Sequence, residues 1–575
     1  MKNFLIGLIV GILVSGLTLL ILGFAIVKLA SSYGEKPVTV ADGSTLVLKL
    51  EGELPEKAPA EIPLPMFEAQ TPITVHEVWE TFRKAAADSK VKGIIFEPRG
   101  LRIGWAKMQE VRDEILQFKK SGKPIITYLR EPGAREYYLA SATDRIMISP
   151  EDSLDVKGLR VEGIFIKNTL DKLGIKADVI HAGKYKDAGD LLTQTSMSPE
   201  TREVLDQILD QYYSNLIDTI AQGRKKPLDA VRAMIDQGPF MAKEALANGL
   251  VDAFGYEEQA GDDMKNRLKQ SELKKVSAKA YLKAPVAAGG VTRRIALVVG
   301  DGAITRGRGG SSDDEGITAS AFIKLLKQVE DDSSIKGVIL RVDSPGGEGT
   351  ASDEILHAER NLSKKKPMVI SMSDLAASGG YYMAITGDPI IAYPNTLTGS
   401  IGVIYARMSL HGLYDKIGVN KQLLTRGHYA DLDSDYSALN DDQRQKIASQ
   451  IDAFYRSFVG KVADGRKKTF EQIEPLAQGR VWLGAQAKLN GLVDELGGLD
   501  RAVELVRKKA NIAASDKITL VPYPAKRSVF DQIFNRSDDS AAIELKIEKA
   551  LDNLPVSALA RGGFLKLMPY TITVK

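Results

Sequence analysis

Short apolar runs alternate with longer amphipathic segments over most of this chain. Runs of about five or six apolar or β-branched residues predict strands. The first of these cover 45–50, 91–96 and 124–129, and a helix is predicted over 108–119. Residues 51–73 are rich in proline and predict an extended loop. Strands that alternate with helices predict a parallel sheet covered by helices on both faces, so the predicted fold class is α/β.

The apolar run near the N-terminus is longer than any other element of this pattern. Phe4–Val27 comprises 24 consecutive uncharged residues. As a helix rising about 1.5 Å per residue, it would cross a hydrocarbon core of roughly 30 Å. A cleaved signal peptide has a shorter apolar core of about 7–15 residues. We therefore predict an uncleaved transmembrane helix, with cleavage near Ser31 as the alternative. Lys2 and Lys28 flank the run almost equally, so the charges do not set its orientation.

The pattern of strands and helices occurs twice. Val91-Lys-Gly-Ile-Ile95 recurs as Ile335-Lys-Gly-Val-Ile339 at a spacing of 244 residues (337 − 93), and Asn248-Gly-Leu-Val-Asp252 recurs as Asn490-Gly-Leu-Val-Asp494 at 242 (490 − 248). An internal duplication predicts two tandem domains of one fold. The predicted parts are a transmembrane anchor (1–30), a tether (31–43), a first repeat (44–283), a linker (284–294), a second repeat (295–525) and a C-terminal tail (526–575).

The composition narrows the range of functions only slightly. The 77 basic and 74 acidic residues leave a net charge of +3, so nothing favours binding of nucleic acid. The sequence contains no cysteine, which excludes disulfides, thiolate metal sites and a cysteine nucleophile.

One serine of the second repeat has the setting of a nucleophile. A strand predicted over 368–372 leads into the small-residue turn Ala376-Ala-Ser-Gly-Gly380, and a helix is predicted from Tyr381. At a helix N-terminus the hydroxyl of Ser378 can be exposed while backbone N–H groups point outward, as an oxyanion pocket requires. Helix capping is the alternative role for such a serine. The matching position of the first repeat is Ala134 (378 − 244).

A glycine-rich loop also distinguishes the two repeats. Asp343-Ser-Pro-Gly-Gly347 follows a predicted strand of the second repeat, and its counterpart Arg99-Gly-Leu-Arg-Ile103 has no glycine pair. The first repeat therefore lacks both the serine and the flexible turn that could donate N–H groups to an oxyanion.

The first repeat instead carries a lysine that the second lacks. Gly183-Lys-Tyr-Lys-Asp187 aligns with Gly427-His-Tyr-Ala-Asp431, so an alanine faces Lys186. The loss of one group in each repeat indicates a composite site shared by both, with drift at two surface positions as the alternative. A serine nucleophile needs a base, and a lysine can serve once burial lowers its pKa. Lys184 and His428 are rival bases.

These segments together resemble the family of bacterial signal peptide peptidase A, also called protease IV, in its long tandem form. The resemblance covers about residues 1–525 and is carried by Asp343–Gly347, Ala377–Tyr382, Thr398–Val403 and Gly183–Asp187. It implies two ClpP/crotonase-like domains and a serine–lysine dyad. The residues it implies are Ser378 as nucleophile, Lys186 as general base, Ser400 as a hydrogen-bond partner of that lysine, and Gly379, Gly346 and Gly347 as oxyanion donors.

The resemblance also implies a biological setting. It is that of a membrane-anchored serine endopeptidase that degrades cleaved signal peptides and other apolar peptides through an acyl-enzyme, without a cofactor or metal. The family forms a homotetramer in the bacterial inner (cytoplasmic) membrane, single-pass, with the catalytic body on the periplasmic side. Two alternatives remain at this stage: an acyl-CoA enzyme on a crotonase-type fold, and a catalytically idle membrane scaffold.

Overall fold

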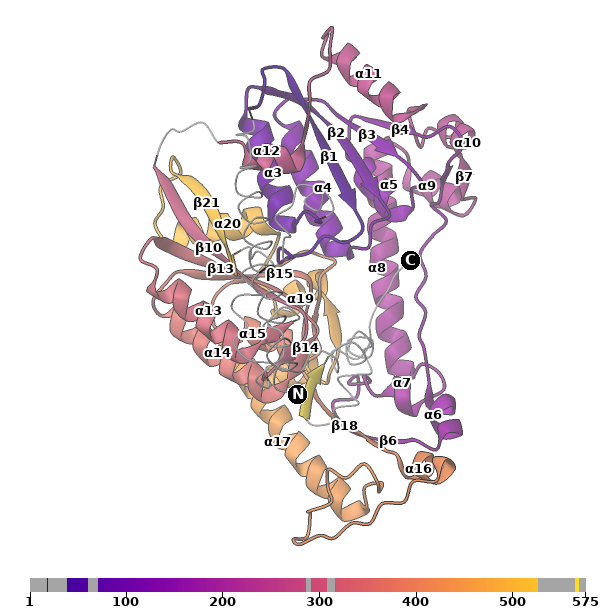
Figure 1. The fold of residues 1–575 in the computed structure, drawn as a ribbon, viewed down its shortest axis with the longest axis vertical. Helices are drawn as coiled ribbons and strands as arrows, with labels where there is room; N and C mark the ends of the chain where they lie inside the picture. Colours follow the sequence, from indigo (N-terminus) through magenta and orange to yellow (C-terminus); the bar gives the residue numbers. More distant parts are fainter. Residues whose placement is uncertain are drawn as a thin grey trace, which may run out of the picture.

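The computed structural model describes residues 39–59, 71–285, 291–307, 316–525 and 564–567, together with Thr18. Figure 1 shows an elongated molecule, with the sheet of the first repeat (indigo to purple) at one end and the second repeat (red to orange) beside and below it, while first-repeat residues 167–224 (purple) reach down toward the other end. The predicted anchor, Phe4–Val27, lies outside the described residues apart from Thr18. Within the described part of the chain, no helix is long and apolar enough to cross a membrane.

The first repeat is built on a parallel sheet. Its strand order is β8-β4-β3-β2-β1-β9, and each neighbouring pair runs parallel. The apolar runs that predicted strands form its centre, where helices cover both faces and leave the strands largely buried. The strands are β1 (Ser44–Glu51), β2 (Val91–Arg99), β3 (Ile125–Leu129), β4 (Arg145–Ile148), β8 (Ala253–Phe254) and β9 (Lys275–Ser277).

The second repeat reproduces this arrangement. Its strand order is β19-β17-β15-β13-β10-β21, parallel except that β19 runs antiparallel to β17. The ladder register shifts at the same point in both copies, between Ser44 and Thr45 and between Arg294 and Ile295. The strands are β10 (Thr292–Asp301), β13 (Ile335–Ser344), β15 (Met368–Ala377), β17 (Leu397–Gly399), β19 (Val481–Leu483) and β21 (Lys517–Tyr523), with β16 (Ile390–Ala392) and β20 (Glu495–Leu496) beside them.

Corresponding helices of the two repeats pack in the same way. In each copy the first tyrosine of the shared pair bonds a backbone carbonyl: Tyr137 Oη donates to Leu250 O (2.6 Å) and Tyr381 Oη to Leu492 O (2.8 Å). Pairs of duplicated helices include α3 (Val75–Ala87) and α13 (Ala319–Asp331), α4 (Trp105–Lys119) and α14 (Gly349–Ser363), α5 (Ala134–Ala140) and α15 (Gly379–Ala384), and α8 (Pro199–Arg224) and α17 (Asp441–Arg466).

The remaining elements are short. Those of the first repeat are β5 (Ser153–Leu154), α6 (Lys167–Leu173), α7 (Asp190–Thr193), α9 (Leu228–Ile235), β7 (Phe240–Met241), α10 (Ala242–Ala247), α11 (Glu257–Arg267) and α12 (Ala278–Lys283). Those of the second are β11 (Ile304–Thr305), β12 (Ile317–Thr318), α16 (His411–Ile417), α18 (Phe470–Ile473), the 3₁₀ turn η1 (Glu474–Leu476), α19 (Gly484–Asn490) and α20 (Leu499–Lys509).

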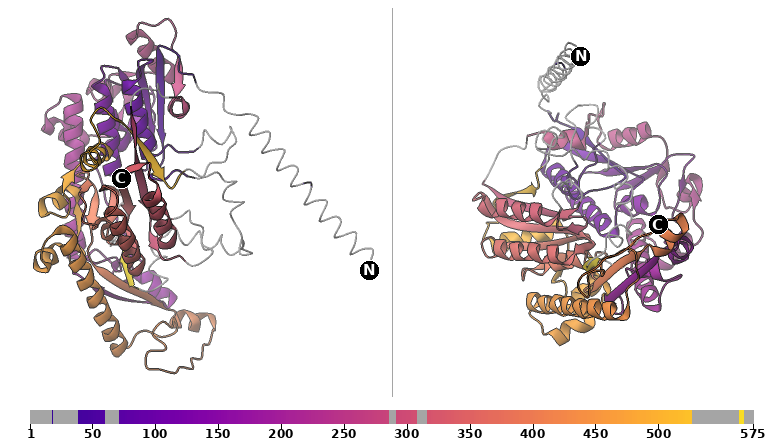
Figure 2. Two further views of the ribbon diagram at one scale, coloured as in Figure 1. Left: turned by 90° about the vertical axis from the view of Figure 1, so that its left-hand side faces the viewer. Right: turned by 60° about the horizontal axis from the view of Figure 1, so that its bottom comes forward.

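A third sheet contains strands from both repeats. Strand β6 (Lys176–Ala182) of the first repeat pairs antiparallel with β18 (Val403–Ser409) of the second along its whole length. The same sheet contains β14 (Gly346–Glu348) and β22 (Phe564–Leu567), in the order β12-β11-β14-β22-β18-β6. Figures 1 and 2 show α8 and α17 running from the two repeats toward the end of the molecule where β6 and β18 lie.

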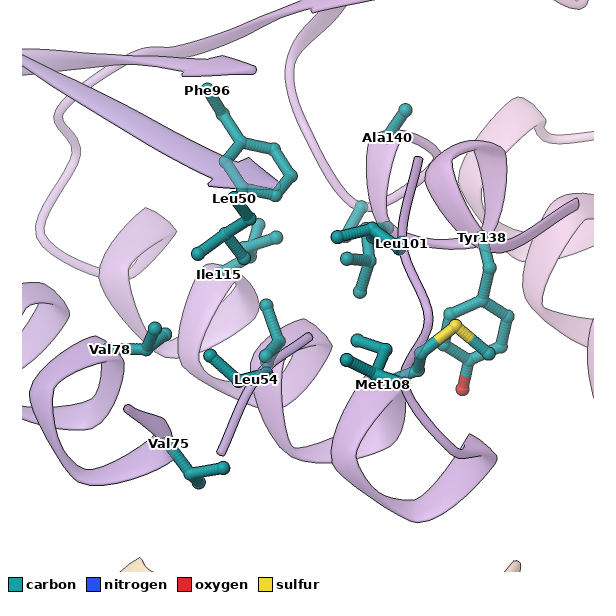
Figure 3. Close-up of a cluster of buried hydrophobic side chains, with 14 of the residues drawn as sticks. Leu50, Leu54, Val75, Val78, Phe96, Leu101, Met108, Ile115, Tyr138 and Ala140 are labelled. Atoms are coloured by element: carbon teal, nitrogen blue, oxygen red, sulfur yellow. The ribbon is translucent and has the colours of Figure 1, made fainter. Parts of the chain in front are cut away.

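Helix α4 is anchored in the core of the first repeat. Figure 3 shows Met108 and Ile115 of α4 among apolar side chains from α3, from β2 and from the loop between β1 and α3. These include Val78, Phe96 and Leu54, respectively. All of these side chains are at most 4% exposed. The helix begins at Trp105, three residues before the predicted start, and its N-terminal turn reaches toward the second repeat.

Candidate active site

Ser378 stands in a strained turn between β15 and α15. Its backbone angles are φ 54° and ψ −112°, in a region that residues with a side chain rarely occupy. Two backbone bonds hold the turn, since Ser378 N donates to Gly399 O (2.7 Å) and its carbonyl accepts from Tyr382 N (2.9 Å). Its side chain makes no capping bond to α15, so the capping alternative does not account for its hydroxyl. Strain of this kind often accompanies function.

The structure brings Lys186 to this serine. Lys186 Nζ lies 2.9 Å from Ser378 Oγ, 3.0 Å from the carbonyl O of Ser400 and 2.9 Å from Ser400 Oγ. All three residues have 0% exposure. The lysine comes from the first repeat and both serines from the second, so one chain supplies every group of this cluster.

The hydrogen-bonding geometry fits an uncharged amine. A neutral lysine has two N–H donors and one lone pair. The carbonyl of Ser400 can only accept, and both serine hydroxyls can accept, so the three contacts match the three N–H donors of an ammonium as well as a neutral amine whose lone pair faces Ser378 Oγ. Full burial favours the neutral form of the amine, because a charged amine would lose its hydration.

A loop that the sequence did not single out holds Lys186 in place. Tyr185 N donates to Gln478 O (2.9 Å), and Ser400 N donates to Arg480 O (2.7 Å). Between these anchors, Gly479 has φ +75°, and a Cβ there would lie 2.6 Å from both the backbone N and the Cβ of Lys186. This loop therefore positions both the lysine and its partner Ser400. The sequence carried no signal for it, because the first repeat has a similar Gln-Gly pair at 237–238.

The predicted oxyanion donors lie beside the serine. A Cβ on Gly379 would come within 3.0 Å of Gly346 Cα and Gly347 N, so the two loops are in contact. The N–H of Gly346 donates to Ser344 Oγ at 3.2 Å. This internal bond favours Gly347 and Gly379, over Gly346, as donors to an oxyanion.

The rival bases lie elsewhere. Lys184 is exposed, with Nζ 4.6 Å from the centroid of the Tyr185 ring. His428 is also exposed, and its Nε2 lies 2.7 Å from Asp442 Oδ2. Of the three candidate bases, Lys186 is the one whose amine lies 2.9 Å from Ser378 Oγ.

The C-terminal tail, for which the sequence suggested no role, contributes a strand to this region. Strand β22 pairs antiparallel with β14, opposing Leu567 to Gly346 and Lys566 to Gly347, and on its other edge with β18. An extended backbone thus lies along the glycine loop next to Ser378.

Comparison with known proteins places the chain in a family. A model of Peptidase family S49 matches twice, over residues 117–271 and 360–513. The chloroplastic serine protease SPPA of Arabidopsis thaliana is 34% identical over 527 residues, which cover 90% of this chain and 77% of that protein. Protease 4 of Salmonella typhi is 32% identical over 481 residues, 80% of this chain and 76% of that protein.

The chain belongs to peptidase family S49, of which it holds two copies of the domain. The predicted resemblance to signal peptide peptidase A is thereby confirmed, and the chain is a serine peptidase whose substrates are peptides. Among solved structures, a ClpP1 mutant from Listeria monocytogenes matches 36% of this chain and 94% of its own at 16% identity, with a TM-score of 0.23. A TM-score this low does not establish a shared fold, so the ClpP/crotonase-like assignment stays a prediction.

Proposed function

We propose that this peptidase cleaves amide bonds with Ser378 as nucleophile and Lys186 as general base. The observation that carries the proposal is the 2.9 Å separation of Lys186 Nζ and Ser378 Oγ in a fully buried site. Ser378 Oγ bonds to the substrate carbonyl carbon while its proton passes to Lys186. The ammonium then gives this proton to the leaving amine as the amide bond breaks, which leaves an acyl-enzyme. Water attacks the ester in the same way and releases the acid.

The backbone of the site would stabilise the negative oxygen that forms at each step. Gly347 N and Gly379 N belong to loops in contact beside Ser378, and preorganised N–H donors of this kind contribute a factor of roughly 10² to 10³ in rate each. Ser400 would orient the amine, since its carbonyl and hydroxyl both lie within 3.0 Å of Lys186 Nζ.

A peptide would bind as an extended strand along β14. The support is β22, which already lies antiparallel on that edge, with Lys566 opposite Gly347. Addition of a strand to a sheet edge is a common mode of peptide recognition, since backbone hydrogen bonds supply affinity whatever the side chains. Cleaved signal peptides and other apolar peptides suit such a site, and the similar proteins SPPA and Protease 4 are proteases.

The cellular setting remains part of the proposal. The length of Phe4–Val27 supports a single membrane anchor, and a bacterial inner membrane with the catalytic body on the periplasmic side follows from the resemblance. A homotetramer follows from the resemblance alone. Recovery of a mature N-terminus near Ser31 from native membranes would contradict the anchor.

Labelling with a fluorophosphonate tests whether Ser378 is the nucleophile. Ser378 Oγ would displace fluoride from phosphorus, and the intact mass would rise by one phosphonyl group. We expect one adduct on Ser378 in the wild type and none in Ser378→Ala. An idle scaffold would take up no label. An acyl-CoA enzyme of crotonase type would bind its thioester substrate without needing Ser378. Peptide hydrolysis near the wild-type rate in Ser378→Ala would overturn the proposal.

A further inference from the structure

A buried group of charges joins the two repeats next to the catalytic loops. Lys107, on α4 of the first repeat, extends Nζ to 2.7 Å from Asp343 Oδ2, 3.9 Å from Glu56 Oε1 and 4.0 Å from Asp374 Oδ2. Its side chain is only 10% exposed. Asp343 and Asp374 belong to the second repeat, so this cation bridges the halves of the chain.

Asp343 is the first residue of the glycine-rich loop Asp343–Gly347, which we call the oxyanion loop. It stands in β13, three residues before Gly346 (346 − 343), at the point where the β13–β15 register shifts. Its Oδ1 accepts a hydrogen bond from Leu375 N (3.0 Å), which closes the ladder across the gap. The position of Asp343 therefore fixes both the start of the glycine loop and the last part of β15.

Asp374 is attached to the nucleophile in the same way. It lies four residues before Ser378 (378 − 374) and accepts hydrogen bonds from Gly104 N and Lys107 N, both at 2.9 Å. It thus caps the N-terminus of α4 from the other repeat. A Cβ at Gly104 would lie 2.2 Å from Asp374 Cγ, so the contact requires glycine there.

The cluster contains more carboxylates than cations. Arg341 pairs with Glu56 and Glu110 in the same interface and is fully buried, and Lys107 forms ion pairs with Asp343 and Asp374. The charge of Asp374 also acts on Arg135 of the first repeat. Burial raises the pKa of Asp374 to about 6, and Lys107 opposes that rise. Asp301, whose pKa burial and then Asp343 raise to about 7, lies in the same field, with Lys57 a weaker cation beside it.

Comparison between the repeats shows that Asp343 and Asp374 have no acidic counterpart in the first repeat. At a spacing of 244, Asp343 corresponds to Arg99 and Asp374 to Arg130, and both arginines are exposed. Asp343 and Asp374 are therefore found in the repeat that carries Ser378, and the cation that contacts them, Lys107, in the repeat that carries Lys186.

We propose that Lys107 is a positioning residue for the hydrolysis. It holds the oxyanion loop and the Ser378 turn at the correct position relative to each other, across the interface between the repeats. The inference rests on the proposed function of Ser378. Without the cation, Asp343 and Asp374 repel each other at the ends of neighbouring strands, so the donors and the nucleophile that follow them move apart. Displacements of about 1 Å in a reactive geometry can cost roughly 10²-fold in rate.

The test is the fluorophosphonate reaction of Lys107→Met, measured as the maximal rate of labelling, the probe concentration for half of that rate, and the final labelled fraction. We expect the maximal rate to fall on the order of tenfold to a hundredfold. The half-saturating concentration should change little, and the final fraction should match the wild type. Lys119→Met is the matched control, because Lys119 lies on the same helix and pairs with Asp144 inside the first repeat. It should label at the wild-type rate.

Two further readouts separate positioning from folding. The rate of Lys107→Met relative to wild type should recover as the pH is lowered, since protonated Asp374 and Asp301 no longer need a cation. Recovery should begin above a pH of about 6, because Lys107 lowers the pKa of both carboxyls in the wild type and its loss lets them take up protons at a higher pH. The double variant Lys107→Met/Asp343→Asn should regain part of the loss, because it removes the unpaired charge. A normal labelling rate with a smaller labelled fraction, or no recovery in either experiment, would overturn the proposal. Absence of labelling in the wild type would instead refute the proposed nucleophile.

Discussion

Replacing Lys186 with methionine removes the base while keeping an unbranched side chain of similar length. General-base catalysis contributes roughly 10² to 10⁴ in rate, and members of a catalytic unit cost on the order of 10³ or more when lost singly. At 1.36 kcal/mol per factor of ten, a 10³-fold loss raises the barrier by about 4 kcal/mol. We therefore expect peptide hydrolysis and fluorophosphonate labelling of Lys186→Met to fall at least 10³-fold.

The fold should survive this substitution. The carbonyl and hydroxyl of Ser400 each lose a partner within 3.0 Å, at a cost of about 1–3 kcal/mol for each buried group left unsatisfied. Removal of a buried amine offsets part of this cost, because that group no longer has to leave water on folding. Circular dichroism and the melting temperature would show whether the variant is folded before its rate is interpreted.

Two variants make the assay specific. Lys186→Arg should be as inactive as Lys186→Met, because a guanidinium does not give up its proton in a protein. Lys184→Met should remain close to wild type, since Lys184 is exposed and lies over the Tyr185 ring. In the wild type, activity should rise with pH as the amine loses its proton. Labelling of Lys186→Met at a rate near that of the wild type would refute the dyad.

Three further predictions follow from particular contacts. Gly479→Ala should lower the labelling rate at least tenfold, because the added Cβ would lie 2.6 Å from Lys186 at φ +75°; an unchanged rate would show that the loop does not set the lysine. Deletion of Phe564–Leu567 should lower the KM for peptides, since β22 lies on the edge of β14 that we assign to substrate; a higher KM would contradict this assignment. Glu359→Met should raise the melting temperature at neutral pH, because both carboxyl oxygens of Glu359 are buried without a hydrogen-bond partner among the residues that the structure describes, and burial raises its pKa well above the usual value. The folded state keeps that proton while the unfolded chain loses it above a pH of about 4.3, so the gain should shrink in acid, and an equal gain at acidic pH would refute the reasoning.

The central strands could be predicted because each is encoded by its own residues. The run predicted over 45–50 forms β1 (Ser44–Glu51), and that over 124–129 forms β3 (Ile125–Leu129). The strand predicted over 368–372 extends to Ala377 in β15. The prediction ended too early because the extra residues include Asp374, a charge that no local pattern places in a strand. Its burial depends on Gly104 and Lys107, about 270 residues away in sequence.

Comparison of the repeats determined which residues to pair but not how they meet. Ala134 opposite Ser378, and an alanine opposite Lys186, indicated a site shared between the repeats. Their separation of 2.9 Å depends on β6 pairing with β18 and on the loop at Gly479, and such pairings leave no periodic signal.

The sequence by itself therefore determined the α/β class, the duplication and the residue types of the site, because these depend on local periodicity and on similarity between two segments. The tertiary structure alone decided that Lys107 bridges the repeats and that a C-terminal strand lies along the glycine loop. Both depend on the burial of charges and backbone groups, and the partners that make this burial favourable are distant in sequence and come together only when the chain folds.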